Sequence, residues 1–472
     1  MKRTTFVTLA ALLGAALACL NPIVAHAQPA ADSGIQSASE PAPAAASGDA
    51  GTAAAAQTGP VIELPPEMMG NAAPPPDPQT DSWPRISLGV SSDADTVTRG
   101  LMPMRMAQSA TVIGGYGQFT LNSTLPGNAD EFSTRASVRR LVLFVAHPIT
   151  DDIRVYTEFE WENAVACQSC NGSVEVEQAF VQWRLAGDAF MLRAGLLLVP
   201  MGIVNQWHEP PVFHGVERPA VDQVIIPSTW RELGAGFTGT IAEMFRYELY
   251  LTTTLDPLRL GENGLSPARS LGSFANARAV AVTGRAEVEP VLGVIAGASF
   301  FLSDLGANGT YYRRTGSERD LRLPLLGYAL DARMRRWGFE ARAVWSQFFF
   351  PNAGDLLAAY REDGSPLFIR EASVGTVPER MQGGYIELAY NVFQQLQLAH
   401  ELLAFIRLET YDSQAAVPDT YKRNPALDID ELTAGLTYRP VTQLVFKADF
   451  QLRDRRLGWD EFQYNLGFGY MF

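Results

Sequence analysis

The sequence predicts an all-β protein, a transmembrane antiparallel β-barrel of about 16 strands with an in-folded third outer loop. Hydrophobic residues make up 47% of the chain, yet no stretch beyond the leader reaches the ~18 uncharged apolar residues of a membrane helix. From about residue 111, apolar and polar residues alternate with a period of two, as in strands with two different faces. Because lipid offers backbone groups no hydrogen-bond partners, an apolar chain without such helices must cross a bilayer as a closed barrel.

The first 27 residues have the pattern of a secretory signal peptide. Lys2 and Arg3 precede an apolar run over residues 6–20, and Ala25-His26-Ala27 supplies a small-x-small cleavage site. We therefore expect the chain to be exported across the inner membrane.

The next two segments precede the barrel. Residues 28–83 are rich in Ala and Pro and hold few large apolar groups, so they are predicted to be disordered and periplasmic. Residues 84–110 form an uncertain lead-in that contains one candidate strand. The barrel itself is expected over residues 111–472.

The last segment shows the alternation most clearly. Large apolar side chains occupy every second position from Phe462 to Phe472, and Gln463 and Asn465 stand between them. A soluble β-sandwich would also bury an apolar face, but it would not need ionisable groups on the polar face of its strands. We expect strands near 112–121, 135–147, 152–162, 174–185, 189–199, 231–241, 245–254, 277–288, 291–301, 321–335, 339–349, 380–391, 400–411, 430–439, 442–453 and 461–472.

The connections alternate in length. Tight turns are expected at 148–151, 186–188, 242–244, 289–290, 336–338 and 440–441, and we assign them to the periplasm. The third long connection covers residues 200–230 and contains aromatic residues, prolines and Ile225-Ile226-Pro227. Because this composition is poorly suited to full solvation, we predict that the segment folds into the barrel as a constriction; an ordinary surface loop is the alternative.

Charged residues on the polar face of the strands and in this loop are the candidate pore-lining set. Both signs occur, which is typical of a wall that faces water. From the strands we take Arg140, Arg154, Glu158, Glu160, Arg333, Arg342, Arg407 and Glu409, and from the loop His208, Glu209, His214, Glu217 and Arg218.

Other chemistry is weakly indicated. His208, Glu209, His214 and Glu217 match no specific metal-ligand spacing, so no metal is predicted. The mature chain also shows no Ser–His–acid set or carboxylate pair placed for catalysis.

Cys167 and Cys170 are the cysteines of the mature chain. A lone C-x-x-C is a weak zinc signal, and no thioredoxin-like pattern surrounds it, so a disulfide in the second outer loop is predicted.

Several segments then point to a known family. Arg140 to Phe144, Val176-Glu177-Gln178-Ala179-Phe180 and Val199-Pro200-Met201-Gly202-Ile203 fit its early strands, and residues 208–218 and 226–230 fit its third loop. The chain resembles porins of the phosphate-selective porin O/P family over most of residues 111–472, most densely in 138–240. The resemblance implies a barrel of ~16 strands, a homotrimer and a diffusion channel. It also implies that Arg193 and the Glu217-Arg218 pair lie at or near the constriction.

One departure concerns the solute. A phosphate channel is expected to line its pore with Arg and Lys, because cations replace the hydration of an anion. This chain holds three lysines, Lys2, Lys422 and Lys447, and candidate lumen positions such as Asp331 and Asp449 are acidic. An arginine row could still form a local anion track, so both possibilities stay open.

The predicted function is passive diffusion of small hydrophilic solutes or ions, with anions such as phosphate as one option, in the cell outer membrane. The expected partners are lipopolysaccharide, outer-membrane lipids and two further copies of the chain, with no cofactor and no enzymatic activity. The formal net charge of -14 argues against nucleic acid as a partner. An outer-membrane barrel enzyme, such as a lipid hydrolase, and a non-conducting structural barrel remain the alternatives.

Overall fold

The computed structural model describes residues 111–472 apart from 130, 166–171, 263, 368–376, 397 and 459. The predicted signal peptide, the segments 28–83 and 84–110, and the Cys167–Cys170 pair lie outside the described residues.

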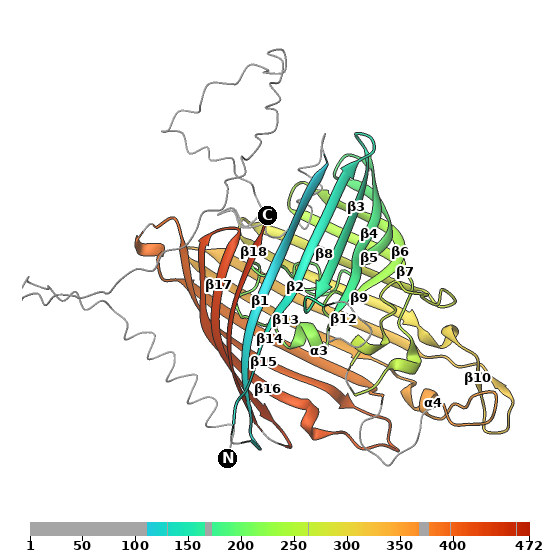
Figure 1. The fold of residues 1–472 in the computed structure, drawn as a ribbon. Coiled ribbons are helices and arrows are strands. Elements are labelled where there is room, and N and C mark those ends of the chain that lie inside the picture. Colours follow the sequence, from blue (N-terminus) through green and yellow to red (C-terminus); the bar gives the residue numbers. More distant parts are fainter. Residues whose placement is uncertain are drawn as a thin grey trace, which may run out of the picture. The chain divides into compact units, whose positions relative to one another are not determined.

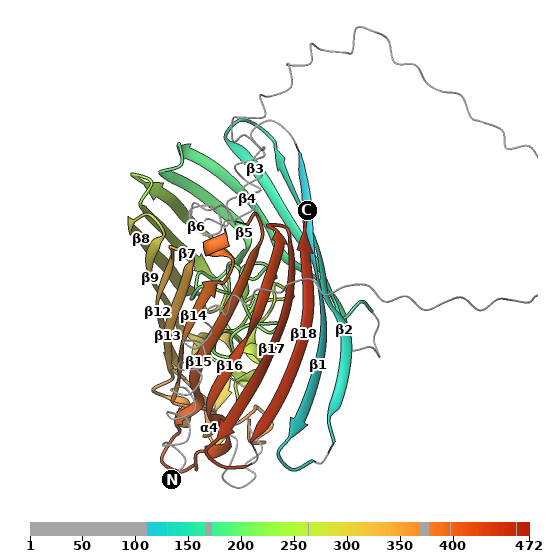
Figure 2. The ribbon, with the colours of Figure 1, turned by 90° about the vertical axis from the view of Figure 1, so that its left-hand side faces the viewer.

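Sixteen antiparallel strands form a closed barrel (Figure 1), which confirms the predicted fold class and strand number. Neighbours along the chain are neighbours in the sheet, and pairing of the first strand with the last closes the ring. Figure 2 shows the strands tilted side by side around the barrel. The strands are β1 (Val112–Pro126), β2 (Ser133–Pro148), β3 (Ile153–Glu162), β4 (Ser173–Ala186), β5 (Phe190–Leu198), β6 (Arg231–Ile241), β7 (Phe245–Thr252), β8 (Ala281–Val291), β9 (Val294–Asp304), β12 (Pro324–Arg336), β13 (Phe339–Phe349), β14 (Arg380–Asn391), β15 (Glu401–Ala416), β16 (Asp428–Val441), β17 (Leu444–Arg455) and β18 (Glu461–Met471).

Short turns join the strands at one end of the barrel and longer connections at the other. The long connections hold a two-stranded hairpin, β10 (Tyr311–Tyr312) with β11 (Glu318–Arg319), which the sequence pattern did not predict. They also hold two short helices, α3 (Val221–Val224) and α4 (Ala353–Leu357). Single 3-10 turns lie at η2 (Pro257–Arg259), η3 (Ser266–Ala268), η4 (Leu305–Asn308), η5 (Gln394–Leu396) and η6 (Pro425–Leu427).

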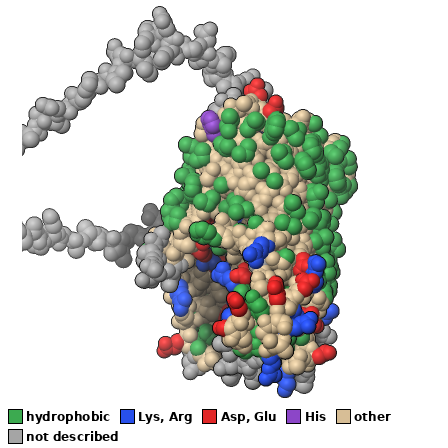
Figure 3. Space-filling view, turned by 90° about the vertical axis from the view of Figure 1, so that its right-hand side faces the viewer, with side chains coloured by type: hydrophobic (Ala, Val, Ile, Leu, Met, Phe, Trp, Pro, Cys, Tyr) green, Lys and Arg blue, Asp and Glu red, His purple; other side chains and the backbone are tan. Residues whose placement is uncertain are grey.

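The two faces of the wall differ as the alternation predicts. On β18, Leu466 is 56% exposed on the outer face, whereas its neighbour Asn465 is 1% exposed on the inner face. On the face drawn in Figure 3, hydrophobic side chains gather over the upper part of the wall and charged side chains gather toward the lower end. No helix in the described part of the chain is long and apolar enough to cross a bilayer.

One side of the interior is apolar, which the sequence analysis did not anticipate. Trp230 lies at the end of the third long connection with its ring centroid 4.5 Å from that of Phe301 on β9 and 6.2 Å from that of Phe348 on β13. Ile225 and Ile226 belong to the same buried cluster. These inward apolar side chains give the connection a core to pack against, so it lies inside the barrel rather than over its mouth.

Candidate functional site

Residues 199–230, called the inward loop below, connect β5 to β6. The side chain of Asn205 joins the two ends of this loop. The Asn205 amide donates to the carbonyl oxygens of Val199 (2.6 Å) and Trp230 (3.0 Å), and its oxygen accepts from the Trp230 N–H (2.7 Å). A single buried amide therefore satisfies backbone groups on both arms of the loop. Figure 1 shows α3 of this loop within the barrel.

Polar side chains of the wall hold the middle of the inward loop. Lys447 donates to the Gly215 carbonyl oxygen (2.8 Å) and stands 3.6 Å from the centre of the Phe213 ring. The Asp449 carboxylate accepts from the Val216 N–H (2.5 Å), and Thr437 donates to the His214 carbonyl oxygen (2.6 Å). Both β16 and β17 thus take part in fixing the path of the loop backbone.

His214 is enclosed on the same side of the barrel. Its Nε2 lies 3.1 Å from Glu340 Oε2 and 3.9 Å from Glu387 Oε1, and its ring stacks on Phe405. Burial lowers the pKa of His214 below its usual value, although the two carboxylates act in the opposite direction. The imidazole therefore behaves as a buried loop anchor.

A second set of charges meets the inward loop from β1 to β4. Arg140 pairs with Glu160 at 3.6 Å, and Arg218 donates to the His208 carbonyl oxygen at 3.2 Å. Burial lowers the pKa of Arg218 to about 10, so it stays cationic at neutral pH. Tyr116 packs edge-on against the His208 ring.

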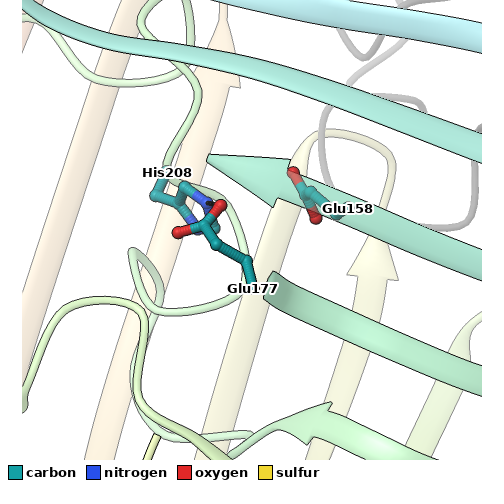
Figure 4. A group of neighbouring side chains, drawn as sticks. All are labelled: Glu158, Glu177 and His208. Atoms are coloured by element: carbon teal, nitrogen blue, oxygen red, sulfur yellow. Dashed lines mark ion pairs between the residues drawn. The ribbon is translucent and has the colours of Figure 1, made fainter. Parts of the chain in front are cut away.

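Glu158, Glu177 and His208 come together from β3, β4 and the inward loop (Figure 4). His208 Nε2 lies 3.5 Å from Glu177 Oε2, and the ligand-type atoms of all three side chains lie within 4.8 Å of one another. Glu158 accepts hydrogen bonds from Gln178 (2.6 Å) and Tyr156 (3.2 Å).

A β-bulge accounts for the position of Glu177. Glu158 pairs with Gln178 and Phe159 pairs with Val176, so Glu177 is an extra residue in the β3–β4 ladder. Such a residue breaks the alternation and re-aims a side chain. Glu177 is therefore completely buried beside Glu158.

Two cavities lie along the inner wall. The short-turn cavity has a volume of about 80 Å³ and is lined on strands near the 242–244 turn, with Tyr156, Gln178, Arg193, Trp207, Glu248 and Arg285 among its residues. The long-loop cavity has a volume of about 240 Å³ and is lined by Arg139, Arg140, Glu160, Glu217, Arg218 and Arg269, among others. On β3, Tyr156 lines the first and Glu160 the second, so Glu158 stands between them.

Most arginines of the wall are paired with carboxylates. Arg285 contacts Asp331 and Glu287, both at 2.7 Å, and Arg246 also reaches Glu287. Arg333 pairs with the same Glu287 and lies over the Trp207 ring of the inward loop. The lumen therefore presents mixed charge instead of a purely cationic surface.

The structure distributes the predicted pore-lining residues among several environments. Arg193 hydrogen-bonds Gln182 and Tyr250, and Glu217 accepts from Asn122. Arg342 donates to the Val212 carbonyl oxygen of the loop.

Other predicted residues lie away from both cavities. Arg407 is fully buried between Glu409 (2.6 Å) and Glu387 (3.2 Å), and Glu409 accepts from the Val221 N–H of the loop. Arg154 lies near the start of β3, and Glu209 is partly buried in the loop.

The four loop residues weighed for a metal do not converge. His208 faces β4, whereas His214 faces β13 and β14, and Glu217 reaches β1. The group that does form combines His208 with two wall carboxylates.

Several residues of the site were absent from the predicted set. Alternation alone would have placed Glu287 and Arg285 on the inner face of β8, and both could have been found that way. Val174, Glu175, Val176 and Glu177 alternate in the same way, so Glu177 could also have been placed on the inner face, but the bulge beside it has no sequence signal.

Comparison with known proteins gives distant matches. No family model matches the chain. A protein of Aquifex aeolicus (strain VF5), described as uncharacterized, is 28% identical over 364 residues, which cover 76% of this chain and 79% of that protein.

Solved structures give further likenesses. The outer membrane channel DcaP of Acinetobacter baumannii is 13% identical with a TM-score of 0.47, over 77% of this chain and 97% of that chain. The anion-selective porin from Comamonas acidovorans is 11% identical with a TM-score of 0.46, over 77% and 99%. Pseudomonas putida OprB is 10% identical with a TM-score of 0.48, over 78% and 96%. At these scores the likenesses are too distant to bear on function.

Proposed function

We propose that this chain is an outer-membrane porin through which small hydrophilic solutes or ions diffuse passively. The observation that carries the proposal is the inward loop, which contacts wall strands on both sides of the interior and leaves a charged cavity on either side. The apolar outer face fits a lipid environment and the polar inner face fits water. No cofactor is needed for such a process.

The charges of the two cavities favour weak selectivity. Arg193, Arg246 and Arg285 face Glu248 and Glu287 in the short-turn cavity. In the long-loop cavity, five arginines accompany four glutamates, namely Arg139, Arg140, Arg218, Arg231 and Arg269 with Glu160, Glu162, Glu175 and Glu217. We infer that opposed charges orient polar solutes as they pass, with a small preference for anions.

Phosphate is not expected to be a strongly favoured solute. Lys447 is the one lysine on a described barrel strand, and its ammonium group is taken up by the Gly215 carbonyl oxygen and the Phe213 ring. Anion contacts would therefore depend on arginines that already pair with carboxylates. Selectivity for phosphate, which the family resemblance implies, is the alternative. The block of conductance by added phosphate distinguishes the two.

The assembly is proposed to be a homotrimer in the outer membrane, surrounded by lipopolysaccharide and lipid, as the family resemblance implies. Chemical crosslinking of the purified protein tests this directly. A ladder that stops at three subunits is expected, and a product that stays monomeric at all crosslinker concentrations would exclude the trimer.

The test of conduction is the reversal potential of the purified protein in a planar bilayer under a KCl gradient, repeated with added phosphate. We expect steady conductance, a weak anion preference and little block by phosphate. Strong block by phosphate would establish the phosphate-selective alternative. No conductance from protein that migrates as a folded barrel would exclude the channel and favour a structural barrel.

A further inference from the structure

We propose that Glu158, Glu177 and His208 form a binding site for a divalent transition-metal ion, such as Zn²⁺, which joins the inward loop to β3 and β4. The three side chains come from three separate segments, and their ligand-type atoms lie within 4.8 Å of one another (Figure 4). The site is a property of this group alone and does not depend on whether the barrel conducts.

The tautomer of His208 is the first support. Nδ1 lies 3.2 Å from the Asn205 carbonyl oxygen, an acceptor that requires the proton on Nδ1. In the neutral ring Nε2 then carries a lone pair, and this lone pair faces Glu177 Oε2 at 3.5 Å. A backbone carbonyl bonded to one ring nitrogen is also the usual support of a metal-binding histidine.

The state of Glu177 is the second support. The residue is 0% exposed, and neither of its carboxylate oxygens has a hydrogen-bond partner among the described residues. His208 Nε2 likewise has none. A buried ionised carboxylate that faces a nitrogen lone pair is unfavourable unless a proton or a metal cation lies between them, and a metal cation can bind both atoms at once.

Neighbouring arginines do not meet this need. Arg140 approaches Glu160, and Arg218 donates to the His208 carbonyl oxygen. Neither guanidinium forms an ion pair with Glu177 or Glu158 within the part of the chain that the structure describes. Among the described residues, the ion-pair contact of Glu177 is therefore with His208 alone.

The donor set indicates the class of ion. One imidazole nitrogen with two carboxylates suits Zn²⁺ and its neighbours, whereas Ca²⁺ and Mg²⁺ prefer sets made of oxygen alone. Glu158 lies on β3 between Tyr156 and Glu160, which line the two cavities.

The experiment is a calorimetric titration of the purified, folded full barrel with ZnCl₂ alone, after removal of metal with a chelator. We expect one Zn²⁺ per chain, with affinity reduced about tenfold or more in Glu177→Gln and in His208→Ala. His147→Ala is the matched control, because His147 is exposed and contacts Thr111, and its affinity is expected to equal that of the wild type. Absence of stoichiometric binding, or binding unchanged in both site variants, would overturn the proposal.

A second measurement needs no variant and so does not depend on whether the variants fold. X-ray absorption of the zinc-loaded wild-type protein is expected to show oxygen and nitrogen ligands with one imidazole. Sulfur ligands, which would place the ion at Cys167 and Cys170, or two or more imidazoles, would overturn the assignment. If the protein did not conduct, the zinc titration and the X-ray absorption measurement could still succeed. The channel proposal and the metal-site proposal are therefore tested independently.

Discussion

The two halves of the inward loop are held inside the barrel by different forces. From residue 219 to 230 the loop packs apolar side chains, and Ile225, Ile226 and Trp230 are all fully buried. From 208 to 218 it is held by directional contacts with charged wall residues, such as Lys447 and Asp449. The apolar half therefore determines whether the loop enters the barrel, and the polar half determines its path and the charges that a solute meets.

The difference between the two halves of the loop predicts the largest loss of stability for a substitution at Trp230. Trp230→Ala removes a fully buried ring from contact with Phe301 and Phe348 and should lower the free energy of unfolding by about 3–5 kcal/mol. Urea titration followed by protease cleavage within residues 199–230 measures both the stability and the release of the loop. Trp337→Ala, at a ring 71% exposed on a short turn, is the control and should change stability by about 0.5 kcal/mol or less. Equal effects of the two variants would contradict the distinction.

A pH effect is expected next, at Asp222 in α3. Burial raises the pKa of Asp222 to about 7. The Glu409 and Asp331 carboxylates also raise this pKa, whereas the Tyr385 hydroxyl and the Arg407 guanidinium lower it. The docked loop thus keeps a proton that the undocked loop releases between about pH 4 and pH 7. Docking stability should fall by roughly 1.4 kcal/mol per pH unit across this window and level off above it. Protease cleavage of the loop at pH 5 and pH 8 measures this dependence.

Asp222→Asn should remove that part of the pH dependence and make the loop more resistant to cleavage at pH 8 than in the wild type. Asp151→Asn, at an exposed turn position, is the matched control and should follow the wild type. A wild-type loop that becomes more resistant as the pH rises would show the opposite sign and rule out this account of Asp222.

A smaller effect is expected in the polar half. Lys447→Met keeps most of the side-chain volume but leaves the Gly215 carbonyl oxygen without its donor, which should cost about 1.5 kcal/mol. Single-channel recordings should show more frequent current fluctuations while the apolar half stays docked. Lys422→Met, in an exposed outer connection, should leave the recordings unchanged. Complete release of the loop by Lys447→Met would mean that the polar half, and not the apolar half, keeps it inside.

The smallest effect concerns charge preference. Arg140→Gln removes one cation from the long-loop cavity, where Arg140 pairs with Glu160. The permeability ratio should move toward cations by about twofold, since a partly screened charge contributes about 0.5 kcal/mol. Reversal potentials in a KCl gradient measure it, and Arg135→Gln, at an exposed position near the start of β2, serves as the control. A shift of the permeability ratio toward anions in Arg140→Gln would contradict the expected effect of this positive charge on charge preference.

The strands were predictable because alternation reports directly which face meets lipid. The observed bounds of β6, β13 and β14 coincide with the predicted 231–241, 339–349 and 380–391. The hairpin of β10 and β11 was missed, because two-residue strands are too short to show a period. The inward fold of 200–230 was anticipated from its apolar residues, but the sequence does not show which wall those residues meet.

The sequence alone determined the barrel, its strand number and the outward apolar face, because each follows from a local pattern of period two. Tertiary structure decided the site. Glu177 faces Glu158 and His208 because a bulge adds a residue to the β3–β4 ladder, and Lys447 reaches the loop because β17 lies beside it in space. Such contacts join residues far apart in the chain, whose meeting depends on register and packing and not on local sequence.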